Sequence, residues 1–188
     1  MDIFSARLEL VRDRKRLLKK QVADHVGMSP QGYGKIESGQ REPNLEVLAK
    51  FPSILDESVD FLIGVTDFDK FGESLYDNYH SVCFNIATVE RELRVLSRYP
   101  NIYDYELGDI KPEQIEAHRV KLTKNLTVLS LQKVQLKDRL IKYLQKQIPF
   151  VSPETFKKID SVTSEMNNLF IPLSPSPEID QDPLDNEQ

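Results

Sequence analysis

The chain has 188 residues, of which 25 are Lys or Arg and 30 are Asp or Glu, and its formal net charge is −5. This length slightly exceeds one typical domain and is enough for a hydrophobic core. One cysteine excludes an intramolecular disulfide, no apolar run reaches the roughly 18 residues of a membrane helix, and the first residues lack the pattern of a signal peptide. We therefore expect a cytoplasmic protein with no membrane partner.

Charge is concentrated in blocks along the chain. Residues 1–41 carry nine basic and five acidic side chains, whereas residues 42–65 carry one base and five acids. The last 17 residues hold five acids and no base. A polyanionic partner responds to a positive end more than to the global charge. The first block is therefore the candidate surface for such a partner.

The first region, to about residue 65, is predicted to form short helices separated by turn signals. Apolar residues recur on one stripe of residues 4–15, and the segment 22–26 ends at Gly27, a favourable helix stop. Ser29 followed by Pro30 predicts an N-cap and the first turn of a helix, which Gly39 ends.

Two further short helices are expected in this region. Residues 43–44 open one of them, and Pro52 prevents it from continuing undisturbed. Ser58 is expected to cap the other. The residues predicted to face inward are Leu45, Leu48, Ala49, Val59, Leu62 and Ile63.

Longer helices are predicted from residue 71 to residue 148. Apolar residues spaced alternately by four and three positions mark a heptad seam, which indicates helix–helix packing. The seam consists of Leu75, Tyr79, Val82, Ile86, Val89, Leu93 and Leu96. Pro100 is expected to end this helix, and residues 101–111 are expected to form a loop.

A single helix of about 36 residues is predicted over 113–148, because neither Pro nor Gly interrupts it. Its two apolar stripes lie on different sides, so we expect neighbours on both, as in a helical bundle or an intertwined dimer. One stripe comprises Ile115, Leu122, Leu126, Leu129, Leu136, Leu140 and Tyr143, and the other comprises Val120, Leu131, Val134, Ile141, Leu144 and Ile148.

The end of the chain combines a short predicted helix over 152–170 with an acidic tail rich in Pro and Ser. The tail has too little apolar content to fold, so residues 172–188 are predicted to be disordered. No segment has a convincing strand pattern. The predicted fold class is all-α, with a helical oligomerisation or partner-binding region over 71–171.

Residues 21–37 place a short helix, a turn and a second helix in succession. This arrangement resembles the helix-turn-helix of the Cro and lambda-repressor-like (XRE) family, and the resemblance runs without a gap over residues 4–64. The resemblance implies a five-helix DNA-binding domain over 1–66. Matching positions include Arg7, Leu8, Arg12, Val22, Ala23, Val26, Gly27, Ser29, Ile36, Glu37, Gly39, Pro43, Leu48, Ser58, Leu62 and Gly64.

The resemblance further implies that the helix opening at Ser29 reads bases in the major groove of double-stranded DNA. The implied DNA-binding residues are Lys19, Ser29, Pro30, Gln31, Gly32, Lys35, Ser38, Gln40 and Arg41. The amide of Gln31 can donate to N7 and accept from N6 of adenine, and the ammonium of Lys35 can donate to O6 and N7 of guanine. Lys19 and Arg41 lie where the family contacts phosphates. The alternative is a solvated helix face.

Three residues of this segment have predicted structural roles. Tyr33 occupies a position that the family usually gives to an apolar residue, so packing is its expected role, with a phosphate contact as the alternative. Arg12 and Glu37 resemble a family pair that joins the first helix to the recognition helix through a partly buried salt bridge. Losing either partner would leave a buried charge unpaired.

The segment also departs from the family pattern. Leu18 replaces the usual Ser or Thr cap of the second helix, and Arg16 replaces the usual glycine before it. Gly32 and Gly34 lie inside the recognition helix, and each costs about 1 kcal/mol relative to Ala. Such glycines would allow close approach to DNA or leave the helix partly disordered until it binds.

No constellation of residues indicates an enzyme, a metal site or a cofactor. Cys83 lies within the heptad-rich helix, so buried packing is its expected role. His80 and His118 are expected at the polar edges of packed helices, and their spacing to Cys83 fits no zinc pattern.

The sequence therefore predicts a DNA-binding transcriptional regulator, most simply a repressor. It would act as a dimer or higher oligomer through 75–148, holding two domains on half-sites about 34 Å apart. Alternatively, these helices form the bundle of one chain. A different reading makes the helical region a binding module for a toxin, an anti-repressor or a signalling peptide.

Overall fold

The computed structural model describes residues 2–98 and 111–169, and these residues form an all-α structure, as predicted. Most of the predicted loop over 101–111 and the predicted disordered tail over 172–188 lie outside the described residues. The short helices are α1 (Ile3–Arg14), α2 (Lys19–Val26), α3 (Pro30–Glu37), α4 (Leu45–Leu48), α5 (Phe51–Leu55) and α6 (Val59–Ile63). The longer helices are α7 (Lys70–Arg98), α9 (Pro112–Gln147) and α10 (Pro153–Leu169).

Local capping explains where the short helices begin and end. The side chain of Ser29 accepts the Gly32 N–H at 3.1 Å, and that of Ser58 accepts the Phe61 N–H at 3.0 Å, as the sequence predicted. Asp2 caps α1 in the same way, through the Ser5 N–H at 2.7 Å. Gly27 ends α2 with a φ of 77°, a left-handed conformation that glycine adopts without steric cost.

The segment after residue 43 differs from the prediction, because it forms two helices instead of one. α4 is a single turn, and the chain begins α5 at Phe51 with Pro52 in its first turn, where the missing N–H is tolerated. Leu45, at the first position of α4, is 84% exposed, and Ala49 and Ile63 also face solvent, so their predicted inward orientation was wrong.

The short helices enclose a hydrophobic core to which each of them except α4 contributes fully buried or nearly fully buried residues. The cluster continues into the longer helices, and the short helices contribute Leu8, Val11, Val22, Ala23, Val26, Tyr33, Ile36, Phe51, Leu55, Phe61 and Leu62. The core fixes α2 and α3 relative to α1, and α3 is thereby held with one side inward and the other outward.

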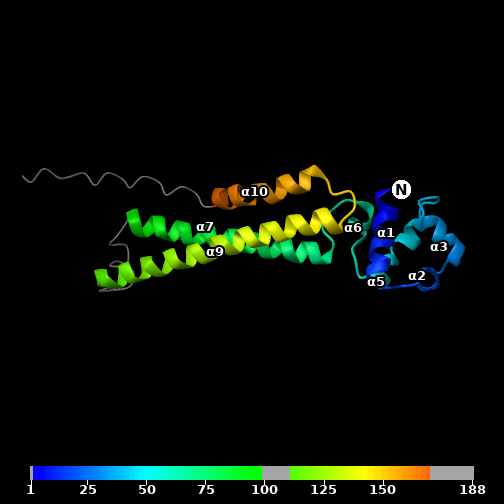
Figure 1. The fold of residues 1–188 in the computed structure, drawn as a ribbon, viewed down its shortest axis with the longest axis horizontal. Helices are drawn as coiled ribbons and strands as arrows, with labels where there is room; N and C mark the ends of the chain where they lie inside the picture. The colour runs from blue at the N-terminus through cyan, green and yellow to red at the C-terminus, as the bar shows by residue number, and fades with distance from the viewer. Residues whose placement is uncertain (1, 99–110, 170–188) are drawn as a thin grey trace, which may run out of the picture.

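The longer helices pack lengthwise (Figure 1). α7 runs away from the short helices and α9 returns beside it in the opposite direction, while α10 packs back along α7. The predicted heptad seam of α7 is largely buried in this arrangement, with Leu75, Tyr79 and Leu96 inside. The seam proposed for dimerisation therefore packs within one chain.

The two apolar stripes of α9 have different surroundings. Leu122 and Leu140, on the first stripe, are buried. The second stripe is divided: Leu144 is buried near the short helices, whereas Leu131 and Val134 face solvent farther along. None of the helices that the structure describes is long and apolar enough to span a membrane.

Candidate nucleic-acid interface

Helix α3 has one side in the core and the other in solvent. Tyr33, Ile36 and Glu37 are buried, whereas Gln31 and Lys35, one turn apart, are exposed. Figure 1 places α2 and α3 at the end of the molecule that lies away from α7, α9 and α10. The long helices therefore leave the outer side of α3 open to a large ligand.

The N-terminus of α3 is capped as the sequence predicted. The Ser29 hydroxyl accepts the Gly32 N–H, and Pro30 has no N–H. The Gln31 N–H has no partner among the described residues. An anion at this helix end would meet this N–H and the positive end of the helix dipole.

The turn after α3 brings two further candidate residues to the recognition helix. The backbone N–H groups of Gln40 and Arg41 both donate to the Lys35 carbonyl, at 2.8 and 3.1 Å. The Ser38 hydroxyl donates to the same carbonyl at 3.2 Å. These four residues are exposed and form one polar surface at the C-terminal end of α3.

The predicted salt bridge between α1 and α3 is confirmed. Arg12 Nε lies 2.5 Å from Glu37 Oε1, and both side chains are nearly fully buried. Burial opposes the charge of Arg12, but the hydrogen bond and charge of Glu37 outweigh it and raise the pKa of the guanidinium. Lys19 Nζ also pairs with Glu37, through Oε2 at 2.8 Å. Part of the Lys19 charge, predicted for phosphate, is therefore already matched inside the protein.

Tyr33 packs in the core, as predicted. Its ring lies 6.4 Å from that of Phe51, and its side chain is fully buried. Burial, together with the charge of Glu37, raises the pKa of the hydroxyl far above its usual value. A buried hydroxyl cannot reach a phosphate, so the alternative role for Tyr33 is excluded in this conformation.

The two glycines of α3 have different surroundings. A Cβ at Gly34 would meet no atom within 4 Å, whereas a Cβ at Gly32 would lie 3.1 Å from the Ser29 hydroxyl oxygen. Gly32 is therefore constrained by the cap itself. Among the described residues, no neighbouring atom requires a glycine at position 34.

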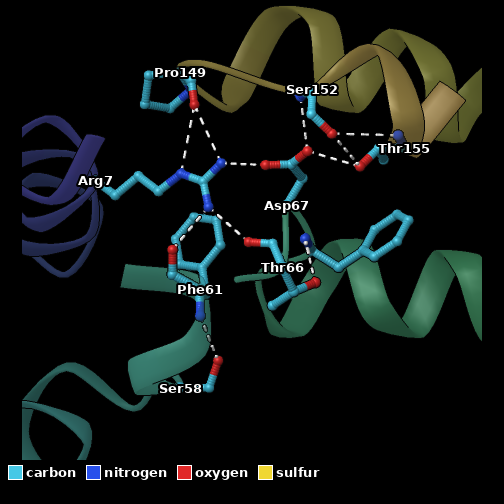
Figure 2. Close-up of polar contacts among 9 residues, drawn as sticks. Arg7, Ser58, Phe61, Thr66, Asp67, Pro149, Ser152 and Thr155 are labelled. Carbon is cyan, nitrogen blue, oxygen red and sulfur yellow. Dashed lines mark hydrogen bonds and ion pairs between the residues drawn. The ribbon is translucent and has the colours of Figure 1, made fainter. Parts of the chain in front are cut away.

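The basic block of residues 1–41 is less available to a ligand than its sequence suggests. Arg7 is fully buried, with its guanidinium paired to Asp67 and donating to the carbonyls of Phe61 at 2.7 Å and Thr66 at 2.6 Å. It also donates to the Pro149 carbonyl at 3.4 Å (Figure 2). Arg7 thus joins α1 to α6 and to the turn before α10.

A second pair lies beside the first. Arg14 Nη1 contacts Asp69 Oδ2 at 2.5 Å, and its Nη2 donates to the Gln147 carbonyl at 2.7 Å. The Tyr143 hydroxyl donates to the same Asp69 oxygen at 2.5 Å. The sequence pattern did not predict that these two aspartates pair with arginines. The one signal for them is a pair of acids four and six residues after the last short helix, in a chain whose first helix carries three arginines.

Other residues considered for chemistry behave as packing or surface groups. Cys83 is buried, as predicted. His118 Nε2 lies 2.7 Å from Glu92 Oε1 at the edge of α7 and α9, and the His80 ring lies 6.1 Å from that of Tyr76. The described residues contain no cluster of side chains able to hold a metal ion.

Comparison with known proteins identifies the same segment. Residues 8–62 match the family model described as Helix-turn-helix, which confirms the helix-turn-helix that the sequence predicted. No solved structure matches the chain.

Three proteins of Bacillus subtilis (strain 168) are similar to part of the chain. The SPbeta prophage-derived uncharacterized HTH-type transcriptional regulator YonR is 43% identical over 61 residues, which are 32% of this chain and 56% of YonR. The uncharacterized HTH-type transcriptional regulators YqaE and YobD are 36% and 31% identical, over 53% and 58% of their lengths and 32% and 35% of this chain. The chain thus spans little more than half of each relative. The printed name of each relative describes that protein as an HTH-type transcriptional regulator.

Proposed function

We propose that the chain is a sequence-specific, double-stranded DNA-binding transcriptional regulator, most simply a repressor. The observation that carries this proposal is the open outer side of α3, with Gln31 and Lys35 exposed one turn apart at the end of the molecule. The family match over 8–62 supports it. A transcriptional regulator acts where the chromosome lies, which in a bacterial cell is the cytoplasm.

Each exposed group has a defined part in this proposal. Gln31 pairs with the N6 and N7 edge of adenine, and Lys35 donates to O6 and N7 of guanine. Arg41 and Lys19 contact phosphates, with Ser38 and Gln40 as weaker backbone contacts, and these set the position of α3 without reading sequence. Lys19 remains half exposed despite its bond to Glu37, so it can contact a phosphate from the same position.

One copy of this surface binds weakly, because it neutralises few phosphates and its affinity falls steeply with salt. A repressor acting through this surface therefore works as a dimer or higher oligomer on paired half-sites, so that one copy holds the DNA near the other.

The test is a mobility shift with the gene's own upstream DNA, repeated across salt concentrations. Wild type shifts the DNA, and the shift weakens as salt rises. Gln31→Ala and Lys35→Ala each weaken binding by about 1–3 kcal/mol, the value of one good base contact, with unchanged circular dichroism. Lys157→Ala, an exposed lysine on α10, is the matched control and leaves the shift unchanged. Unaltered binding in both α3 variants would contradict the proposal.

A further inference from the structure

The outer side of α9 carries an apolar surface that no described part of the chain covers. Val120, Val128, Leu131 and Val134 are between 43% and 65% exposed. They span 15 residues, and the first and last lie about 21 Å apart along the helix. The opposite side of α9 packs on α7 through residues such as Leu122 and Leu140. A soluble helix does not need apolar residues on both sides unless both sides have a neighbour.

Charged residues lie at equal distances on either side of Leu131, with Lys124 between Val120 and Val128 and Asp138 beyond Val134. Lys124 lies seven positions before Leu131 and Asp138 seven positions after it. Seven residues make about two helical turns, so all three share the same side of α9. Asp138 accepts a bond from Lys142 at 2.7 Å but stays more than half exposed. Lys124 has no ion-pair partner among the described residues. From Lys124 to Asp138 this side of the helix is therefore positive, then apolar, then negative.

When a second copy of this helix runs in the opposite direction, the positive end of each copy lies opposite the negative end of the other. We infer that two copies of the chain associate through this side of α9, with the two helices antiparallel and the two-fold axis at Leu131. The Leu131 side chains then meet at the axis, and Val128 and Val134 of each copy flank them. Lys124 of each copy lies opposite Asp138 of the other, so the interface contains two ion pairs related by symmetry.

The charges disfavour a parallel pair in register. Parallel helices in register would place Lys124 opposite Lys124 and Asp138 opposite Asp138, and like charges across an interface disfavour association. The antiparallel arrangement converts both repulsions into attractions. The same apolar contacts are available in either direction, so charge decides the orientation.

This arrangement determines how far apart the two DNA-binding surfaces lie. The end of α9 is joined to α1 through the bond from Arg14 to the Gln147 carbonyl at 2.7 Å. Leu131 lies 16 residues before Gln147, or about 24 Å, so the two α9 ends are about 48 Å apart in the pair. Each α3 lies beyond its own end (Figure 1). The two α3 surfaces would therefore be farther apart than one DNA turn of about 34 Å.

The inference specifies the self-association that the proposed function assumes, and its test uses no DNA, so the two can fail separately. Sedimentation equilibrium of the full chain should give a dimer. Leu131→Lys should weaken the dimer at least roughly 100-fold, because a leucine from each copy leaves the interface. Leu45→Lys makes the same change at a residue exposed elsewhere and should leave the dimer intact. A monomeric wild type, or a dimer that Leu131→Lys leaves intact, would overturn the inference.

Charge reversal tests the orientation. Lys124→Glu and Asp138→Lys should each weaken the dimer by about 10-fold, and the double variant should restore it, because each new charge again faces its opposite. Lys157→Glu, on α10, controls for the change in net charge. Failure of the double variant to recover would overturn the antiparallel arrangement, since parallel helices would face like charges in every one of these variants.

Discussion

Helices α1 and α3 both belong to the group of short helices, but the arginines of α1 point into the protein and the exposed polar side chains of α3 point to solvent. Arg7, Arg12 and Arg14 of α1 each pair with a carboxylate of the protein. Gln31 and Lys35 of α3 face solvent. The basic side chains of the first 41 residues therefore have two roles. Those of α1 form ion pairs that stabilise the fold, whereas Lys35 of α3 is free to contact a ligand.

The largest expected effect is the loss of stability when an arginine of α1 is removed, compared with the removal of the exposed lysine of α3. Arg7→Ala should lower the free energy of unfolding by about 3–5 kcal/mol, because it leaves Asp67 buried without its charged partner. Lys35→Ala should change it by less than about 0.5 kcal/mol, because Lys35 is exposed. Urea unfolding followed by circular dichroism measures both. Similar values for the two variants would remove the distinction between α1 and α3.

Acid should weaken the contact between α1 and the longer helices. Burial acts to raise the pKa of Asp67, but hydrogen bonds from Thr155, Ser152 and Arg7 outweigh it and hold the pKa below the usual 3.8. A lowered pKa in the folded state contributes stability above the unfolded value, and this contribution disappears as pH falls through the folded value.

The unfolding free energy of Asp67→Asn tests this sign. Wild type should exceed the variant by a constant amount above about pH 5, and the difference should shrink as pH falls from about 4 toward 2. Glu46→Gln, at an exposed position, serves as the comparison for a surface carboxylate. A difference that stays constant down to pH 2 would show that the charge of Asp67 does not stabilise the fold.

The smallest expected effect concerns the link between α1 and α2. Arg16 has a φ of 54°, in the left-handed region that disfavours residues with a Cβ. Arg16→Gly should therefore raise the free energy of unfolding by about 1 kcal/mol. Arg16→Ala removes the same charge but keeps the Cβ, so it should give no such gain. Equal effects in the two variants would assign the change to charge instead of backbone strain.

Local signals predicted most of the helices. Caps such as Ser29 and Ser58 and stops such as Gly27 act within a few residues, so the sequence contains the whole interaction. The family resemblance added the Arg12–Glu37 pair, which lies 25 residues apart in sequence. The outward orientation of Leu45 was missed because a one-turn helix has no periodicity from which to predict its buried side.

Contacts between residues far apart in the chain could not be predicted from the sequence pattern. The bond from Arg7 to the Pro149 carbonyl joins residues 142 positions apart, and no spacing in a single sequence marks such a partner. The sequence likewise showed that α9 has two apolar stripes, but it did not show which stripe α7 would cover. The DNA-binding roles of the α3 residues remain predictions, because they depend on a partner molecule.

A nuclear magnetic resonance titration tests the central claim most directly, because it locates the DNA on the chain. Isotope-labelled full-length protein is titrated with the upstream DNA, and backbone amide resonances are followed. We predict that the changes concentrate in residues 29–41, on α3 and the turn after it. Changes confined to α9, with the amides of 29–41 unaffected, would contradict the claim that the outer side of α3 is the DNA-binding surface.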